Sequence, residues 1–224
     1  MLSPDGILPG NAIPAMMRLG LISIEPFVEE NLNPVSYDLT LGDEVMVYKK
    51  WAGYDETYDV RPQFGLSRAE IAGKVRDGSD MFSQDFRSVL SRGCILDVKE
   101  EPETVKFKID PERGWVLKPG IGYLMHTRER ICTNKYVPII DGKSSIGRLF
   151  MLVHFTAGFG DPGFDGQYTM EVSVLHPLRV YAGMKIAQIR FHTIAGSPKL
   201  YDGNYTGEAA TGPVASRAFR QFVK

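Results

Sequence analysis

The sequence predicts a mainly β domain, folded as a barrel or a sandwich with few short helices. Short runs rich in β-branched and aromatic residues follow one another from Cys94 onward, separated by Pro- and Gly-containing turns. An earlier run, residues 36–50, alternates apolar and polar residues as half-buried strands do. No long segment repeats its apolar residues at helical spacing. Closely spaced strands without intervening helices are typical of barrels and sandwiches.

The length, composition and net charge limit which classes of protein the chain can belong to. The chain has 224 residues, of which 43% are hydrophobic, and this is enough for a substantial core in one domain. Its formal net charge of −1 argues against a nucleic-acid partner, which requires a basic face. Two cysteines, Cys94 and Cys132, indicate a reducing compartment, although one bridge stays open as an alternative.

The chain start lacks the pattern of a signal peptide. No apolar run approaches the roughly 20 residues that a membrane helix needs. We therefore expect a cytoplasmic protein that does not bind a membrane.

The sequence predicts a short helix, a partly helical excursion, a C-terminal arm and a series of strands. A short helix covers 11–19, with Asn11 as its cap and Gly20 as its stop. Residues from about 50 to 105 are rich in glycine and charge, hold a capping box at 67–70, and are predicted to be a partly helical excursion from the sheet. The tail, about 196–224, is predicted to be an extended arm of this single domain, 1–224. Strands are expected at 21–24, 36–50, 94–98, 104–109, 114–118, 122–127, 136–140 and 178–194.

Polar residues concentrate between Asp141 and Val172. A turn with two hydroxyls, Ser144 and Ser145, precedes Arg148, and Glu171 lies in a β-prone run after an Asp-Pro-Gly bend. Each residue alone is compatible with a surface turn or a solvent-facing side chain. Together they are more polar than a core hairpin requires, and they indicate a site.

Several known chemistries lack their signatures in this sequence. There is no Walker-type phosphate loop, no Gly-x-Gly-x-x-Gly and no Gly-x-Ser-x-Gly. The four histidines stand far apart, and no His-x-Glu accompanies a Cys-x-x-Cys, so the zinc deaminase signature is absent. What remains is chemistry without zinc. Glu171 can accept a proton from water, Arg148 can orient a carbonyl, and the two serines can bind a water or a phosphate.

The motifs resemble those of the dCTP deaminases of the dUTPase-like superfamily. Residues 33–42, NPVSYDLTLG, are similar to the Pro-x-Ser-x-Asp-Leu-x-Leu-Gly motif of that family. Pro119-Gly120, followed by Thr127 and Glu129, resembles its Pro-Gly strand. Residues 142–171 resemble its Gly-Arg-Ser-Ser-x-x-Arg core, its Thr-Ala, its Asp-Pro-Gly-Phe and its Gly-x-x-x-x-Glu, and segments 182–188 and 201–216 also fit.

The resemblance implies a fold and a mechanism. The fold would be a dUTPase-like distorted β-barrel of the β-clip or jelly-roll type, assembled as a homotrimer with active sites between subunits. Glu171 would be the general base, and the Ser144 hydroxyl and the Ala157 carbonyl would hold the attacking water. Arg148 would orient Glu171 and stabilise the pyrimidine. Water would add to C4 of cytosine and ammonia would leave, without zinc.

The resemblance also implies a nucleotide subsite. Asp161 would bind the 3′-hydroxyl of the deoxyribose. Mg²⁺ would be bound through the triphosphate, without protein ligands. The predicted substrate-binding residues are Lys143, Ser145, Phe155, Asp161, Tyr168, Gln188, Tyr201, Asn204 and Glu208.

The expected reaction is conversion of dCTP to dUTP and ammonia. A pure dUTPase is disfavoured because Glu171 stands five residues after Gly166, which is the deaminase spacing. A bifunctional deaminase and dUTP diphosphatase, and a nucleotide-binding regulator on the same fold, stay open. Lys143 replaces the usual arginine, and Asn204 and Glu208 stand where lysine and glutamine are common. The phosphate end is therefore where we expect departures from the family.

Overall fold

The computed structural model describes residues 6–48 and 96–222. These residues fall into two compact units. One comprises 6–46 with 107–214, and the other comprises 47–48, 96–106 and 215–222. The first unit holds every predicted site residue. Most of the predicted excursion, including its capping box at 67–70, and Cys94 lie outside the described residues.

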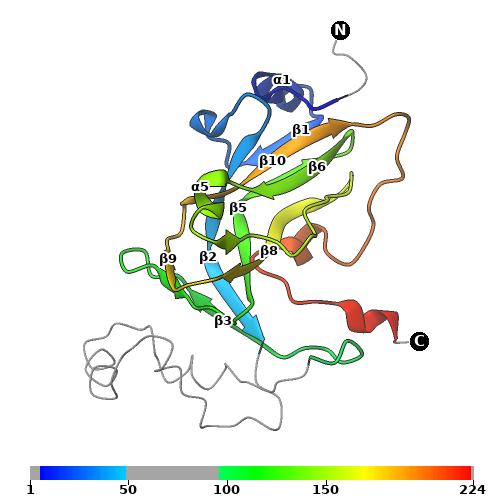
Figure 1. Cartoon of the computed structure of the whole chain (residues 1–224). Coiled ribbons are helices and arrows are strands. Elements are labelled where there is room, and N and C mark those ends of the chain that lie inside the picture. Colours follow the sequence, from blue (N-terminus) through cyan, green and yellow to red (C-terminus); the bar gives the residue numbers. More distant parts are fainter. Residues whose placement is uncertain (1–5, 49–95, 223–224) are drawn as a thin grey trace, which may run out of the picture. The chain divides into compact units, whose positions relative to one another are not determined.

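Strands dominate the described chain (Figure 1). The helical elements are short: α1 (Ile13–Arg18), α5 (Ser144–Gly147) and the 3-10 turns η1 (Gly10–Ala12), η2 (Glu29–Asn31), η4 (Gly207–Ala210) and η5 (Ala218–Gln221). The strands are β1 (Ile22–Glu25), β2 (Tyr37–Tyr48), β3 (Thr104–Lys108), β4 (Trp115–Leu117), β5 (Tyr123–Thr133), β6 (Tyr136–Gly142), β7 (Met151–Leu152), β8 (Asp165–Val174), β9 (Leu178–Val180) and β10 (Lys185–Thr193).

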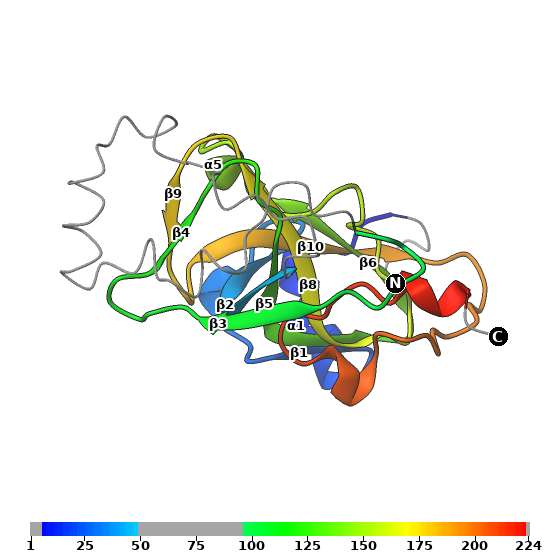
Figure 2. The same cartoon turned by 90° about the horizontal axis from the view of Figure 1, so that it is seen from below.

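The main sheet is antiparallel and runs in the order β6-β10-β2-β5-β8-β7, with β1 paired to β5. β4 and β9 form a separate ribbon. Strands β5 and β8 lie side by side in both views (Figures 1 and 2). The predicted mainly β class with few helices is confirmed.

The alternation in 36–50 correctly predicted a strand, but residues 37–42 of β2 are buried on both faces rather than half-buried. In β2 the side chains of Tyr37, Leu39 and Leu41 are fully buried. In β8 the even-numbered Met170 and Val172 are buried, whereas the odd-numbered positions are half-buried. Because successive side chains of a strand point to opposite faces, β8 presents Glu171 on the face opposite its core residues.

Two local predictions were wrong. Residues 96–98 of the strand expected at 94–98 are not in a strand, because Asp97 forms a turn in which its Oδ1 accepts the Lys99 N–H at 2.9 Å. Asn11 does not cap the first helix, since the chain enters α1 through η1 and Pro14 occupies the first turn. Gly20, with φ +68°, does end the segment as predicted.

Among the described residues, no helix is long and apolar enough to cross a membrane. Cys132 is a free thiol.

Candidate active site

The candidate general base, Glu171, lies in the middle of β8. Its cross-strand partner is Leu124 of β5. The side chain is half-buried, and Oε2 accepts a hydrogen bond from the backbone N–H of Phe155, with N and O 3.3 Å apart. Glu171 is therefore joined to the loop that follows β7.

That loop, residues 153–160, is held against the edge of β6. The N–H of Ile140 donates to the Gly158 carbonyl at 2.7 Å, and the N–H of Gly160 donates to the Pro138 carbonyl at 2.8 Å. A Cβ on Gly158 would lie 2.2 Å from the Ile140 carbonyl oxygen, so only glycine allows this approach. The loop carries Ala157, whose carbonyl was predicted to bind the attacking water.

Thr156, just before Ala157, adopts φ +60°. A β-branched residue rarely has a left-handed backbone, and such strain clusters at ligand sites. The anchors on β6 hold Thr156 in this conformation, and its neighbours Phe155 and Ala157 are exposed. The loop thus presents backbone groups to solvent beside Glu171.

The hydroxyl turn forms the short helix α5, which follows β6 directly. Ile146 is buried and anchors the helix, whereas Ser144, Ser145 and Arg148 are exposed. The Arg148 N–H donates to the Ser144 carbonyl at 3.0 Å. Within the described part of the chain, no hydrogen bond joins Glu171 to Arg148 or to Ser144, so the predicted trio is not linked directly.

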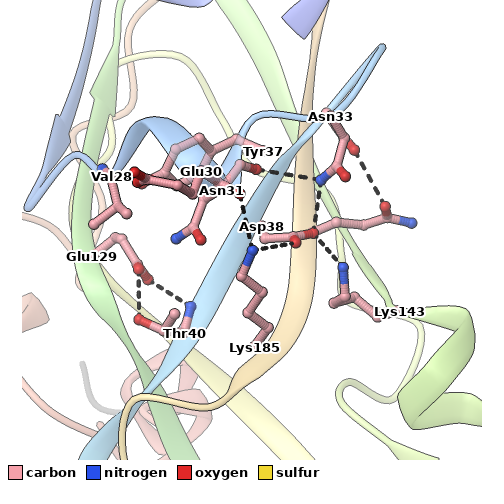
Figure 3. Close-up of polar contacts among 12 residues, drawn as sticks. Val28, Glu30, Asn31, Asn33, Tyr37, Asp38, Thr40, Glu129, Lys143 and Lys185 are labelled. Atoms are coloured by element: carbon pink, nitrogen blue, oxygen red, sulfur yellow. Dashed lines mark hydrogen bonds and ion pairs between the residues drawn. The ribbon is translucent and has the colours of Figure 1, made fainter.

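The predicted phosphate end is a charged cluster around Asp38 of β2 (Figure 3). Oδ1 of Asp38 lies 2.5 Å from Lys143 Nζ and accepts from Asn33 Nδ2 at 2.8 Å. Oδ2 lies 3.3 Å from Lys185 Nζ. Burial disfavours the ionised form of Asp38, but the hydrogen bonds from Lys143 and Asn33 outweigh it, and the pKa of this carboxyl is lowered.

Gln188 of β10 connects this cluster to the start of the hydroxyl turn. Its Nε2 donates to the Gly142 carbonyl at 3.3 Å, and its Oε1 accepts from the Ser36 hydroxyl at 3.2 Å. Lys143 and Gln188, both predicted to lie near the phosphates, are thus brought together by tertiary structure.

Comparison with known proteins decides the family. The family model described as "dCTP deaminase-like" matches residues 7–81 and 74–194, which is most of the chain. The protein belongs to the dCTP deaminase-like family.

Named relatives share this family over nearly their full length. A Clostridium botulinum (strain Alaska E43 / Type E3) protein named "dCTP deaminase, dUMP-forming" is 38% identical over 204 residues, covering 91% of each chain. A Leptospira biflexa (strain Patoc 1 / Ames) protein of the same name is 37% identical over 220 residues, covering 97% of this chain and 99% of the relative.

A solved structure supports the fold. The 2′-deoxycytidine 5′-triphosphate deaminase from Agrobacterium tumefaciens superposes with a TM-score of 0.52 at 22% identity. The match covers 85% of this chain and 49% of that one. The mainly β, barrel-like fold that the motifs implied is therefore confirmed, since it is shared with a solved dCTP deaminase.

Asp161, which was predicted to bind the sugar, lies at the bend before β8. Its side chain is exposed there. Tyr168 projects from the face of β8 opposite Glu171 and packs on Phe164, with ring centroids 4.6 Å apart. Burial raises the pKa of Tyr168 above its ordinary value. The structure therefore separates Tyr168 from the base side of the strand.

The tail packs beside this bend. The Tyr201 N–H donates to the Pro162 carbonyl at 2.8 Å, and the Gly212 N–H donates to Gln167 Oε1 at 2.7 Å. Asn204 is exposed. Glu208 belongs to η4, but its side chain lies outside the described part, so its place near the phosphates stays a prediction.

Sequence reasoning missed three members of the charged cluster: Asn33, Asp38 and Lys185. The available signal was Asp38 itself, a carboxylate among the buried apolar residues of β2. In the described ranges 6–48 and 96–222, no three His, Cys, Asp or Glu side chains are grouped as a metal site.

Proposed function

We propose that this protein catalyses the hydrolytic deamination of dCTP. The observation that carries the proposal is the near-full-length match, at 37% and 38% identity, to two relatives named dCTP deaminase. The chain also carries Ser144, Arg148 and Glu171 at the motif positions to which the family resemblance assigns the chemistry.

In this mechanism Glu171 accepts a proton from water, and the resulting hydroxide adds to C4 of cytosine. The same carboxyl then returns the proton so that ammonia leaves. The Ser144 hydroxyl and the Ala157 carbonyl hold the water, and Arg148 stabilises the reacting ring. The 3.3 Å bond from the Phe155 N–H supports this assignment, because it holds one carboxylate oxygen in place.

We infer that the final product is dUMP rather than dUTP. The motifs led to dUTP as the expected product, with a bifunctional enzyme as the alternative. The relatives are named "dUMP-forming", which favours that alternative. Converting dCTP to dUMP consumes two waters and releases ammonia and pyrophosphate.

The proposal for metals treats Mg²⁺ and zinc differently. Mg²⁺ is proposed to be bound by the nucleotide phosphates, where it would neutralise part of their charge. The residues at this end fit a metal carried by the nucleotide, because the buried carboxylate of Asp38 is already occupied by two lysines and an amide. Zinc independence stays a prediction from the motifs.

The protein is proposed to be a homotrimer with shared sites. Large apolar side chains are exposed on the segments that follow Arg148 and flank Glu171 in the chain, and exposed apolar surface can mark an interface. These residues are Leu149, Phe150, Leu152, Phe155, Phe159 and Leu175. A second copy is the partner that the family resemblance implies for this surface.

One experiment tests the function. Purified protein is incubated with dCTP, dCMP or dUTP and Mg²⁺, and the products are separated by chromatography. We expect dUMP, ammonia and pyrophosphate from dCTP. Accumulation of dUTP would show deamination alone. Binding without any turnover would overturn the proposal in favour of a regulator.

A further inference from the structure

Lys185, at the start of β10, shares one buried carboxylate with Lys143 (Figure 3). The two ammonium groups contact different oxygens of Asp38, at 2.5 Å for Lys143 and 3.3 Å for Lys185. The Asp38 side chain is only 4% exposed, whereas the Lys185 side chain is 42% exposed. The buried carboxylate of Asp38 therefore holds Lys185 from the protein side, while the ammonium remains partly exposed to water.

A β-bulge places Lys185 in the cluster. In β10, Ala187 pairs with Leu39, so a regular ladder would pair Lys185 with Leu41. The register shifts between Ala187 and Lys185, and Lys185 pairs with Thr40 instead. Thr40 is two residues from Asp38, so both point to the same face of β2. The bulge thus turns Lys185 from the face of Leu39 and Leu41 to that of Asp38, and bulges near sites commonly redirect a side chain in this way.

The cluster carries excess positive charge. Two ammonium groups meet one carboxylate, which leaves a local net charge of +1. Each ammonium has three N–H donors. Lys185 uses one on Asp38 and one on the Glu30 carbonyl at 3.1 Å. Lys143 uses one on Asp38. Donors therefore remain on both lysines for an anion.

We propose that Lys185 is a second phosphate-binding residue, which acts with Lys143 on the polyphosphate of the nucleotide. The inference rests on the proposed function. It also accounts for two departures at the phosphate end. Lys143 stands where the family usually has an arginine, and its ammonium cannot make the two parallel hydrogen bonds that a guanidinium makes to phosphate. Asn204 stands where the tail usually has a lysine. A cation from β10 compensates for both, and Asp38 is the positioning residue that holds the pair.

The test compares Lys185→Gln and Lys185→Arg with the wild type. Lys108→Gln is the matched control, because Lys108 is an exposed lysine that also contacts two carboxylates, Asp43 and Glu44. Binding of inorganic tripolyphosphate is measured by calorimetry, and kcat and KM for dCTP are measured at fixed ionic strength. Thermal melting confirms that each variant is folded.

We expect Lys185→Gln to weaken tripolyphosphate binding and to raise the KM for dCTP, each about tenfold, with kcat within about twofold. Lys185→Arg should recover most of the affinity, and Lys108→Gln should change nothing. Tripolyphosphate binding that is unchanged in Lys185→Gln, or absent in the wild type, would overturn the inference. Lack of dCTP turnover by the wild type would overturn the proposed function instead, since the calorimetry does not depend on catalysis.

Discussion

The backbone N–H of Phe155 donates to Oε2 of Glu171, with N and O 3.3 Å apart. The donor lies in a loop held to β6, and the acceptor lies on β8. Elsewhere in the described chain, no hydrogen bond or ion pair involves the other oxygen, Oε1. One oxygen is therefore fixed by the fold, and the other is left for a water.

This geometry predicts the behaviour of Glu171→Gln. The amide keeps the size of the side chain, but it cannot accept the proton from water. We expect deamination to fall by about 10²–10⁴-fold, while the Kd for dCTP stays within about threefold. Ammonia release and calorimetry measure the two quantities. Glu112→Gln, at an exposed turn, is the control, and a loss smaller than about tenfold in Glu171→Gln would remove Glu171 from the role of base.

Gly158→Ala tests whether the loop positions the chemistry. The added Cβ would lie 2.2 Å from the Ile140 carbonyl oxygen, so the loop must move away from β6. We expect a loss of about 1–3 kcal/mol in the free energy of unfolding. We also expect kcat to fall by about tenfold or more, because the groups of Phe155 and Ala157 shift.

Gly122→Ala is the control for that substitution, since a Cβ there meets nothing within 4 Å. Denaturant unfolding and steady-state kinetics are measured for both variants. A wild-type kcat in Gly158→Ala would show that the loop position does not matter to the reaction.

Glu129 predicts a pH dependence of stability. Burial raises the pKa of this carboxyl in the folded state, although Thr40 donates to it from both N–H and Oγ1, at 2.9 and 2.6 Å. The folded protein therefore retains this proton at a pH where the unfolded chain, with a pKa of about 4.3, has lost it. Its contribution to stability is largest below that pH and declines as pH rises through the folded-state pKa.

Glu129→Gln is neutral at every pH and can still accept from the Thr40 N–H. We expect the unfolding free energy of the wild type, relative to this variant, to decrease as pH rises from about 4 through the neutral range. Urea unfolding across that range measures the difference. A constant difference would show that Glu129 has no raised pKa.

Zinc independence is tested by chelation. Protein treated extensively with a zinc chelator, freed of the chelator and supplied with Mg²⁺, should keep its full turnover of dCTP. Metal content is checked by mass spectrometry. Activity that disappears and returns only with zinc would contradict a mechanism based on Glu171 alone.

The assembly is tested at the exposed apolar surface. Leu152 is 54% exposed and lies on β7. We expect light scattering to give a trimer for the wild type and a smaller species for Leu152→Lys, because burying an unpaired ammonium is costly. Activity should fall with the trimer fraction. An active wild-type monomer would exclude shared sites.

Several features were determined by the sequence alone. The alternation of apolar and polar residues in β2 is a local property of the sequence, and it correctly predicted a strand. The glycine at position 20 is equally local, and it correctly predicted the end of the first helical segment. The motifs between Gly142 and Glu171 identified the family, because their order and spacing are properties of the chain itself. The strand expected at 94–98 failed at residues 96–98, since a run of apolar residues does not show whether a partner strand is present.

The tertiary structure alone assembled the charged cluster around Asp38. Lys143 and Asp38 are 105 residues apart, and only the pairing of β10 with β2 and β6 brings them together. Lys185 joins them through one bulge, which reverses the face on which its side chain lies. Period-two alternation assumes a regular ladder, so it assigns Lys185 to the wrong face. The register of hydrogen bonds between distant strands, rather than any local preference, placed this cation beside Asp38.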